Sequence, residues 1–385
     1  MLTKIKLKNF MSFRNETIID VKATNYKFLS ETNVYNGVLK GLLFVGANAS
    51  GKTNAIKSIL FLFMMLFSNE NFNTTPFFCF FSSSDEMELE YTFNINNDQI
   101  VYGFSLTREG VVNKEYLEVN NRKMFYRIRT NAESKVTKRK NYDEQDIDNK
   151  TLFIRNIYFN TKFQGYPSLN KWFDFLSNSV YFNSVERNIV SNNKLLDTTK
   201  YIEEYGVDKI NKFFKFFGFN QEIRYENKYQ ISKDLLAIIK DRKEIFLKKN
   251  NIDIWIPLFC ESLGNQTLLN MLPVIFHTLE NECILVIDEF SSAFHNELEE
   301  LIVRYFMTNS KSSQLFIVSH STNLLSNILL RPDQIYSINF DDEKGSLLKR
   351  FSSEGPRESQ NLEKMYLSGV FNGLPNYKNT PNSSK

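Results

Sequence analysis

The chain has 385 residues, of which 42% are hydrophobic, and its 47 basic and 44 acidic residues give a formal net charge of +3. This composition allows a substantial core, and the near balance of charge excludes a uniformly basic nucleic-acid binder while leaving room for a local patch. No signal peptide is visible, and the longest apolar run, residues 59–67, is about half of the roughly 20 residues that a membrane helix needs. We therefore expect a cytoplasmic protein without membrane contact.

The first third of the chain reads as strands around one strand–loop–helix unit. The opening residues alternate apolar and basic side chains up to a turn at Asn9, which predicts an edge strand. Residues 37–45 have strand character, and residues 54–67 are apolar at helical spacing. Residues 86–129 resemble an antiparallel meander, because short apolar runs alternate with turn residues. Residues 131–150 are polar and charged throughout, which predicts a mobile loop.

Helical and strand signals mix between residues 152 and 250, where the clearest helix spans residues 200–219 and stops near Gly218. The pattern then becomes a regular alternation that is typical of a parallel α/β sheet. Its expected elements are a helix at 267–280, a strand at 283–290, a helix at 297–308 and a strand at 314–320. Three separated cysteines, Cys79, Cys260 and Cys283, form no CxxC pair, and we expect them to be buried thiols.

The stretch GANASGKT, residues 46–53, lies between the expected strand at 37–45 and the expected helix at 54–67. In that setting the G-x-x-x-x-G-K-T pattern cradles phosphates, because backbone N–H groups and the helix N-terminus face the anion. Lys52 can reach the β- and γ-phosphates of a nucleotide, and the Thr53 hydroxyl can ligate Mg²⁺. The alternative is a chance glycine-rich turn. The predicted nucleotide-binding residues here are Gly46, Asn48, Ser50, Gly51, Lys52 and Thr53.

A carboxylate for the magnesium ion is expected at the end of a buried strand, and CILVIDEF supplies one. Asp288 ends the apolar run and would hold the metal, and Glu289 is placed to deprotonate the attacking water. An exposed acidic pair that merely caps a strand is the alternative. Acidic pairs seldom follow such apolar runs without a partner cation, so we favour the metal site.

Two further segments follow the order of a known kind of ATPase. ESLGNQ precedes a helix, where Ser262 and Gly264 offer a hydroxyl and free N–H groups to an anion, although alone it is simply a good helix N-cap. His320 ends the strand after Glu289, where a lone histidine is usually structural. Between a phosphate loop and an aspartate–glutamate strand, ESLGNQ resembles the signature motif of ABC-type ATPases, and His320 resembles their switch histidine.

The motifs together resemble one bacterial family. KLKNFMSF, GANASGKT, ESLGNQTLLNMLPVIF, CILVIDEF, SHSTNLL, RPDQIYSI and YLSGVFNGLP occur in the order found in single-chain ABC/SMC-like ATPases of abortive-infection and anti-phage systems. These are relatives of the OLD and RecF ATPases, and the nearest types are the ATPase subunit of PARIS-type systems and the AbiL-type ATPase. The resemblance covers residues 1–60 and 255–376 well and is general between them.

The resemblance implies that Lys52 and Thr53 bind phosphate and Mg²⁺, and that Asp288 is the Walker B aspartate. It also implies that Glu289 is the catalytic base, that Ser262 and Gly264 form the signature, and that His320 is the switch. Family members often have an aspartate and a proline where this chain has Ser291 and Asn296, which puts the coupling of two ATP sites or the hydrolysis rate in doubt. Gln164 is one candidate for the glutamine loop.

Nothing resembles the TOPRIM nuclease domain into which OLD-type relatives continue. Asp341, Asp342 and Glu343 fall in an expected hairpin turn, where solvated side chains are the preferred interpretation, and His277 lies on a core-like helix. A basic stretch could contact nucleic-acid phosphates, but an acidic run follows it, and we favour a solvated, partner-contacting loop. The basic residues are Arg122, Lys123, Arg127, Arg129, Lys135, Lys138, Arg139 and Lys140.

The expected protein is an α/β, ABC-type P-loop ATPase head with an antiparallel β subdomain and a mixed α/β insertion between the Walker A and signature motifs. Its expected divisions are residues 1–130, 131–250 and 251–385. The resemblance implies that ATP and Mg²⁺ are bound between two copies of the chain. It further implies a phage-encoded trigger and a separately encoded effector, a TOPRIM-type nuclease, which the ATPase holds and releases. The alternative is a RecF-like repair ATPase that clamps DNA.

Overall fold

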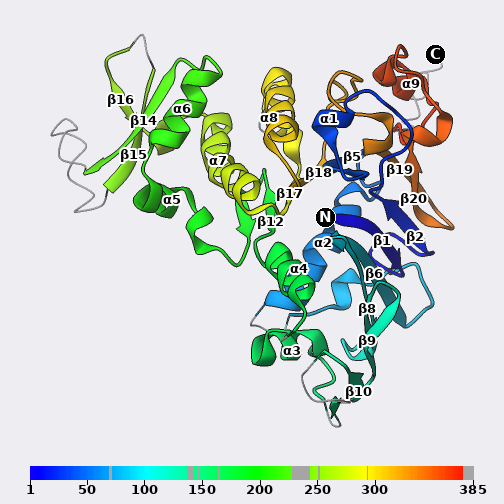
Figure 1. The fold of residues 1–385 in the computed structure, drawn as a ribbon. Helices are drawn as coiled ribbons and strands as arrows, with labels where there is room; N and C mark the ends of the chain where they lie inside the picture. Colours follow the sequence, from blue (N-terminus) through cyan, green and yellow to red (C-terminus); the bar gives the residue numbers. More distant parts are fainter. Residues whose placement is uncertain are drawn as a thin grey trace, which may run out of the picture.

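A computed structural model describes residues 1–68, 72–136, 142–144, 147–163, 165–227, 243–249, 252–292 and 294–375. Two large sheets and a smaller three-stranded one organise these residues (Figure 1). No helix among the described residues is long and apolar enough to cross a membrane.

The larger sheet is antiparallel, and it contains the predicted meander. Four of its strands are β6 (Glu86–Ile95), β7 (Asp98–Thr107), β8 (Val112–Val119) and β9 (Arg122–Ile128). The β6–β7 turn places Asn96 and Asn97 at φ of 51° and 69°, which is the left-handed conformation that a tight hairpin requires and asparagine tolerates. The meander prediction is confirmed.

Two predictions about the margins of this sheet are wrong. Strand β1 (Leu2–Lys8) is not an edge strand, because it lies between β6 and β2 (Thr17–Asp20). The stretch expected to be a loop at 131–150 contains β10 (Asn131–Ser134) and β11 (Tyr142–Glu144), which extend the sheet beyond β9. Residues 137–141 and 145–146 of that stretch lie outside the described residues.

The second sheet has a parallel centre in the order β12–β17–β18–β5–β19, with antiparallel strands β13 and β20 at its two edges. Its apolar strands are buried on both faces, as parallel sheets require. The strands are β5 (Gly41–Gly46), β12 (Val180–Asn183), β13 (Asn188–Val190), β17 (Ile284–Asp288), β18 (Gln314–Val318), β19 (Ile335–Asp341) and β20 (Gly345–Arg350).

Alternation along these strands divides the core between two layers of helices. Leu42 and Phe44 face the core shared with α2 and the antiparallel sheet, whereas Leu43 and Val45 face the core shared with α7 and α8. Helices α3 and α4 pack in the first core. The helices are α2 (Lys52–Phe67), α3 (Phe153–Thr161), α4 (Pro167–Ser177), α7 (Leu263–Asn281) and α8 (Asn296–Asn309).

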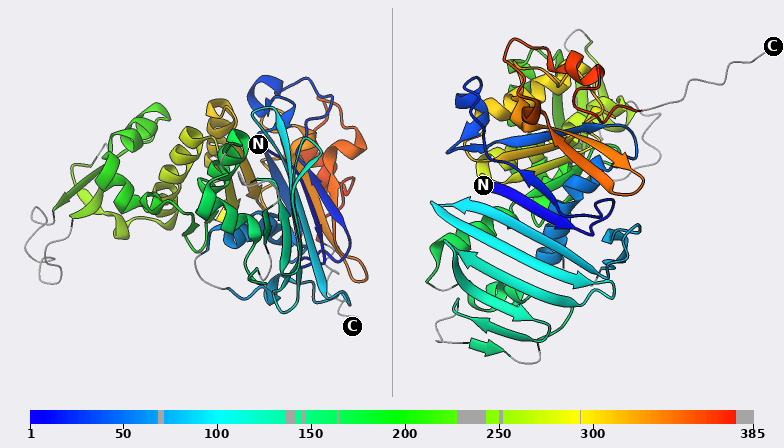
Figure 2. Two further views of the ribbon diagram at one scale, coloured as in Figure 1. Left: turned by 60° about the horizontal axis from the view of Figure 1, so that its bottom comes forward. Right: turned by 90° about the vertical axis from the view of Figure 1, so that its right-hand side faces the viewer.

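The three-stranded sheet lies at the end of the molecule opposite the antiparallel sheet (Figure 2). It comprises β14 (Gln221–Asn227), β15 (Lys243–Lys249) and β16 (Trp255–Pro257), next to α5 (Thr198–Tyr205) and α6 (Asp208–Phe216). The single helix predicted at 200–219 is wrong, because Gly206 adopts a φ of 74° and ends α5. The remaining short elements are α1 (Ser30–Asn33), β3 (Val34–Tyr35), β4 (Val38–Leu39) and α9 (Leu362–Leu367).

The prediction of buried thiols holds for Cys79 and Cys283 but is wrong for Cys260. Cys260 ends a short 3₁₀ turn that connects β16 to the signature segment, and its side chain is exposed. Cys79 and Cys283 lie within the packed parts of the fold, where a thiol behaves as a small apolar group.

Candidate nucleotide-binding site

The phosphate-loop segment connects β5 directly to α2, as predicted. Its backbone takes positive φ values at Gly46, Ala49 and Gly51, of 152°, 60° and 105°. A Cβ atom at Gly46 would lie 2.4 Å from the carbonyl oxygen of Ile338, and one at Gly51 would lie 2.2 Å from Ser346 Oγ. Both positions therefore need glycine for conformation and for space, and the loop is held against β19 and β20.

Lys52 is the first residue of α2, and its side chain folds back over the loop. Its Nζ donates to the carbonyl oxygens of Gly46 and Ala47, at 2.9 and 2.6 Å. Burial lowers the pKa of Lys52 to about 8, against the opposing influence of the Glu289 and Asp288 charges. An ammonium group that is short of solvent is well suited to bind an anion that enters the loop.

Thr53 and Asp288 meet across the sheet. The Thr53 hydroxyl donates to Asp288 Oδ1 at 2.9 Å, and the Asp288 carboxylate is 2% exposed. Its other oxygen, Oδ2, accepts from the Tyr181 hydroxyl at 2.9 Å. Burial raises the pKa of Asp288, and the hydrogen bonds from Tyr181 and Thr53 oppose that effect. Tyr181 lies on β12, and its contact with Asp288 was not predicted, because VYFN has only the pattern of a short apolar strand.

Glu289 and His320 face each other beside this pair. His320 Nε2 lies 3.8 Å from Glu289 Oε2. Glu289 has a φ of 55°, which is rare for a residue with a side chain and typical of functional positions. The His320 backbone N–H donates to Ser291 Oγ at 3.0 Å, so the serine that departs from the family pattern ties the two segments together. Burial, followed by the Lys52 charge, lowers the pKa of His320.

Most of the side chains described above line one cavity of about 410 Å³. It is lined by Asn48, Ala49, Gly51, Lys52, Thr53, Asn54, Glu289 and His320. The cavity thus brings four of the predicted loop residues together with the predicted base and switch, whereas Gly46, Ser50 and Asp288 do not line it. Asn54 was not predicted; its side-chain amide donates to Ser12 Oγ at 2.8 Å, which connects the start of α2 to the turn after β1.

The residues at this site fit a nucleotide with a magnesium ion. The Ser50 hydroxyl is buried in the loop and has no hydrogen-bond partner among the described residues. The Thr53–Asp288 oxygen pair offers the hard donors that Mg²⁺ prefers. The described residues contain no group of three His, Cys, Asp or Glu side chains that could hold a metal. This donor set suits an ion that shares its ligands with substrate phosphates and water.

The predicted signature residues lie apart from this cavity. Ser262 is the N-cap of α7, where its Oγ accepts from the Asn265 N–H at 3.3 Å, and Gly264 lies in the first turn of that helix. Neither residue lines the cavity. Gln164, the candidate glutamine-loop residue, lies outside the described residues.

Arg127 does not contribute to a basic surface. It forms a fully buried ion pair with Glu115, and its guanidinium donates to the carbonyl oxygens of Asp148 and Thr151. Arg122 and Lys123 are exposed, whereas Lys138, Arg139 and Lys140 lie outside the described residues. Arg127 therefore connects β9 to the segment that precedes α3. For this residue, both the favoured prediction of a solvated loop and the alternative of a phosphate contact are wrong.

The other polar residues considered in the sequence have structural surroundings. His277 is 7% exposed, and its Nε2 lies 2.9 Å from the Asn178 carbonyl oxygen. Asp341 lies at the end of β19 in the predicted hairpin, where its Oδ1 accepts from the backbone N–H of Glu343 and Lys344. The expectation of a solvated turn at residues 341–343 is confirmed.

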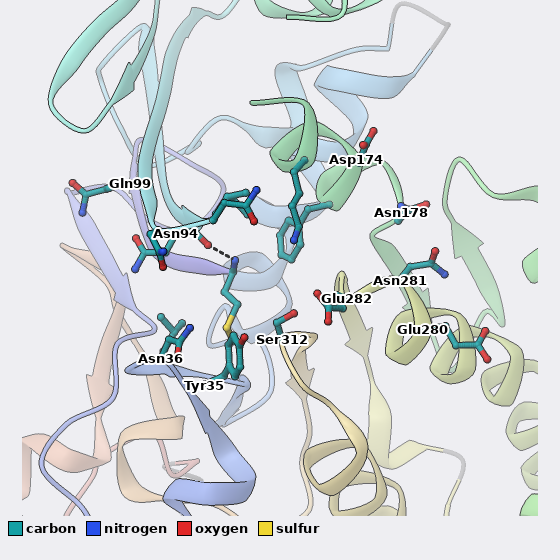
Figure 3. Close-up of a pocket in the computed structure, with 17 residues that line it drawn as sticks. Tyr35, Asn36, Asn94, Gln99, Asp174, Asn178, Glu280, Asn281, Glu282 and Ser312 are labelled. Atoms are coloured by element: carbon teal, nitrogen blue, oxygen red, sulfur yellow. Dashed lines mark hydrogen bonds between the residues drawn. The ribbon is translucent and has the colours of Figure 1, made fainter. Parts of the chain in front are cut away.

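A larger cavity, of about 930 Å³, lies where the β6–β7 turn, α4 and the end of α7 approach one another (Figure 3). Asn94 and Gln99 line one side, and Asp174, Glu280 and Glu282 supply carboxylates. It contains none of the motif residues, and its three carboxylates outnumber its basic groups, Lys171 and the Met1 amino group, so that its net charge disfavours a phosphate. The smaller cavity at the loop is therefore the better nucleotide site.

The sheet order, with the phosphate loop after β5 and the Asp288–Glu289 pair at the end of β17, defines an ABC-type P-loop fold. More particularly, the chain belongs to the family described as "AAA domain, putative AbiEii toxin, Type IV TA system", whose sequence profile matches residues 42–326. No curated protein matches the sequence.

Several solved structures are similar to this chain. An Smc head bound to the C-winged helix domain of ScpA is 16% identical, with a TM-score of 0.52, and the match covers 92% of this chain and 99% of that chain. The SMC head domain from Thermotoga maritima is 17% identical, with a TM-score of 0.48 and coverages of 90% and 97%. The recombination mediator RecF is 12% identical, with a TM-score of 0.40 and coverages of 89% and 96%. The likeness to the ScpA-bound head concerns the fold, and the predicted ABC-type fold class is confirmed.

Proposed function

We propose that this protein binds and hydrolyses ATP with Mg²⁺, and that it serves as the sensor or scaffold subunit of an anti-phage defence system that holds and releases a separately encoded effector. The observation that carries the ATPase part is the meeting of Thr53 with Asp288 beside Lys52. These three residues come from the two motifs that ATP hydrolysis requires, and Glu289 lines the same cavity as Lys52 and Thr53.

Each residue has a distinct task in this proposal. Lys52 and the loop N–H groups bind the phosphates, and Thr53 and Asp288 would hold Mg²⁺, which neutralises charge on them. Glu289 accepts a proton from a water molecule that attacks the γ-phosphorus, while the bond to the β–γ bridging oxygen breaks. The products are ADP and inorganic phosphate. In this proposal His320, whose Nε2 lies 3.8 Å from Glu289 Oε2, would contact the γ-phosphate and report its loss.

A second copy of the chain would complete the site. Ser262 does not line its own chain's cavity, and exposed apolar side chains surround it in sequence. Ile254, Phe259 and Leu263 are 63%, 61% and 67% exposed. Large apolar side chains gathered in this way often mark an interaction surface. We propose that this face docks against the nucleotide cavity of a second protomer, so that Ser262 and Gly264 meet the γ-phosphate held there.

The defence role rests on the family. Its description names an AbiEii toxin and a type IV toxin–antitoxin system, and the motif order resembles ATPases of abortive-infection systems. In this proposal a phage-encoded trigger changes the ATP-bound assembly and frees the effector, a TOPRIM-type nuclease. The PARIS-type and AbiL-type ATPases are the nearest parallels.

A pull-down of tagged Glu289→Gln protein, from cells that carry its native neighbouring genes, tests this role. ATP is present throughout, and half of each sample is treated with nuclease. A stoichiometric neighbour-encoded protein that survives the nuclease supports the effector model and identifies the effector. Recovery of DNA alone, lost at high salt, would instead support a RecF-like clamp, because salt weakens phosphate contacts.

A further inference from the structure

Tyr181 is buried beside the predicted magnesium site without lining the nucleotide cavity. Strand β12 pairs with β17 in parallel register, so that Tyr181 lies opposite Val286 and Asn183 lies opposite Asp288. Tyr181 is therefore two residues behind Asp288 along the sheet, and its side chain extends forward to the carboxylate. The residue is 4% exposed and packs in the core between the two large sheets.

The two oxygens of Asp288 have different partners. Oδ1 accepts from the Thr53 hydroxyl at 2.9 Å and from the Glu289 N–H at 3.1 Å. Oδ2 accepts from the Tyr181 hydroxyl at 2.9 Å. Because hydrogen bonds hold both oxygens, the carboxylate has one orientation, and Oδ1 is the oxygen on the side of the cavity where Thr53 lies. A phenylalanine at position 181 would fill nearly the same volume but would leave Oδ2 without this donor.

The number of oxygens that a carboxylate offers matters to the choice of metal. Mg²⁺ demands a near-ideal octahedron and is usually bound through one or two carboxylates with several waters, whereas Ca²⁺ takes more ligands in flexible geometry and accepts both oxygens of one carboxylate. A group that hydrogen-bonds to a metal ligand fixes the orientation of that ligand. Removing such a group typically lowers the metal affinity by about 10–100-fold.

We infer that Tyr181 is a positioning residue: by holding Oδ2, it fixes the Asp288 carboxylate with Oδ1 alone turned toward Thr53, and so favours Mg²⁺ over Ca²⁺ at the nucleotide site. This inference rests on the proposed function, since it requires that ATP and a metal bind there. It assigns to the phenolic hydroxyl a role in metal selectivity that the aromatic ring alone would not have.

The test compares the native protein with Tyr181→Phe in a binding assay. The unfolding temperature is measured with the non-hydrolysable ATP analogue adenylyl-imidodiphosphate while MgCl₂ or CaCl₂ is titrated, so no turnover is needed. Tyr336→Phe is the matched control, because Tyr336 is also 4% exposed and donates to a backbone carbonyl, that of Asp20, away from the cavity. Scans without nucleotide establish that both variants are folded.

We expect Tyr181→Phe to raise the half-saturating Mg²⁺ concentration by about tenfold and to change the Ca²⁺ value less, so that the preference for Mg²⁺ falls. Tyr336→Phe should match the native protein. An unchanged ratio of the two ions in Tyr181→Phe would overturn the inference alone. If the analogue raises the unfolding temperature of the native protein with neither Mg²⁺ nor Ca²⁺, the proposed function is overturned, and the inference with it.

Discussion

The hydroxyl of Thr53 donates to Asp288 Oδ1 at 2.9 Å, although 235 positions separate the two residues in the chain. The contact exists because β5, which leads into the phosphate loop, and β17, which ends at Asp288, both pair with β18. Parallel strands bring their carboxyl ends to one edge of a sheet, where ligands bind in α/β folds. In the proposed function, this contact holds together the two oxygens that would bind Mg²⁺.

Replacing Lys52 with alanine should abolish nucleotide binding. The ammonium group is the principal positive charge of the cavity, and the native protein should gain about 2.7 kcal/mol of stability at a nucleotide concentration of 100 times the dissociation constant. Thermal unfolding with and without ATP and Mg²⁺ measures this gain. The exposed Lys311→Ala is the control and should keep it. Equal ATP-dependent stabilisation in Lys52→Ala would contradict the assignment.

Nucleotide affinity should fall as the pH rises above about 8. Burial lowers the pKa of Lys52 to about 8, so the ammonium is charged below that pH and loses its proton above it. A bound phosphate needs the charged form, and binding must then take up a proton. The lowered pKa also has a consequence for stability: the unfolded lysine binds more protons between pH 8 and its usual 10.5, so this residue's contribution to folding stability rises across that window.

Calorimetric titration of ATP analogue into the protein at pH 8, in buffers of different ionisation enthalpy, measures the proton uptake. We expect about half a proton per nucleotide at pH 8 and almost none at pH 6.5. Uptake that does not change between these two pH values would contradict the lowered pKa of Lys52.

The parts of the site that could be predicted are those formed by short, continuous segments of the sequence. The loop 46–53 and the Asp288–Glu289 pair each combine a recognisable motif with an apolar strand, and neither depends on a distant partner. Tyr181 could not be found in this way, because its role depends on the pairing of β12 with β17 across more than a hundred residues. A local pattern shows which face of a strand is buried but not which strand lies beside it.

The errors in the fold have similar causes. The alternation in β1 predicted a strand, but its neighbours on both sides, β2 and β6, are set by tertiary pairing. β10 alternates exposed and buried positions, but its two buried residues are the small Ala132 and Ser134, so the sequence shows no apolar alternation there. Residues 200–219 have helical spacing throughout, and the left-handed conformation of Gly206 nonetheless divides them.

Glu289→Gln should bind ATP but hydrolyse it at least about 100-fold more slowly, because the amide cannot accept the proton of the attacking water. Phosphate release at saturating ATP measures the rate, and the unfolding temperature shows that binding persists. Glu297→Gln on the exposed start of α8 is the control. A variant at position 289 that turns over ATP at the native rate would remove Glu289 from the role of base.

Leu263→Asp should prevent ATP-dependent dimerisation without weakening the monomer. Leu263 is 67% exposed and is the first residue of α7, directly after the N-cap Ser262. An aspartate in the first turn of a helix interacts favourably with the exposed N–H groups, by about 0.3–1 kcal/mol, so the monomer should be as stable as before. In the proposed dimer, however, the same charge would be buried against the second protomer without a partner, which is costly.

The measurement is sedimentation of Glu289→Gln protein with ATP, with and without the second substitution. We expect Leu263→Asp to weaken the dimer by about 100-fold, which corresponds to roughly 2.7 kcal/mol. Ile328→Asp is the matched control, since Ile328 is 68% exposed and lies far from the signature segment in sequence. If both substitutions leave the dimer intact, the surface around Ser262 is not the dimer interface. If Ile328→Asp alone disrupts it, the second protomer docks on a different face, and the signature assignment of Ser262 and Gly264 loses its structural basis.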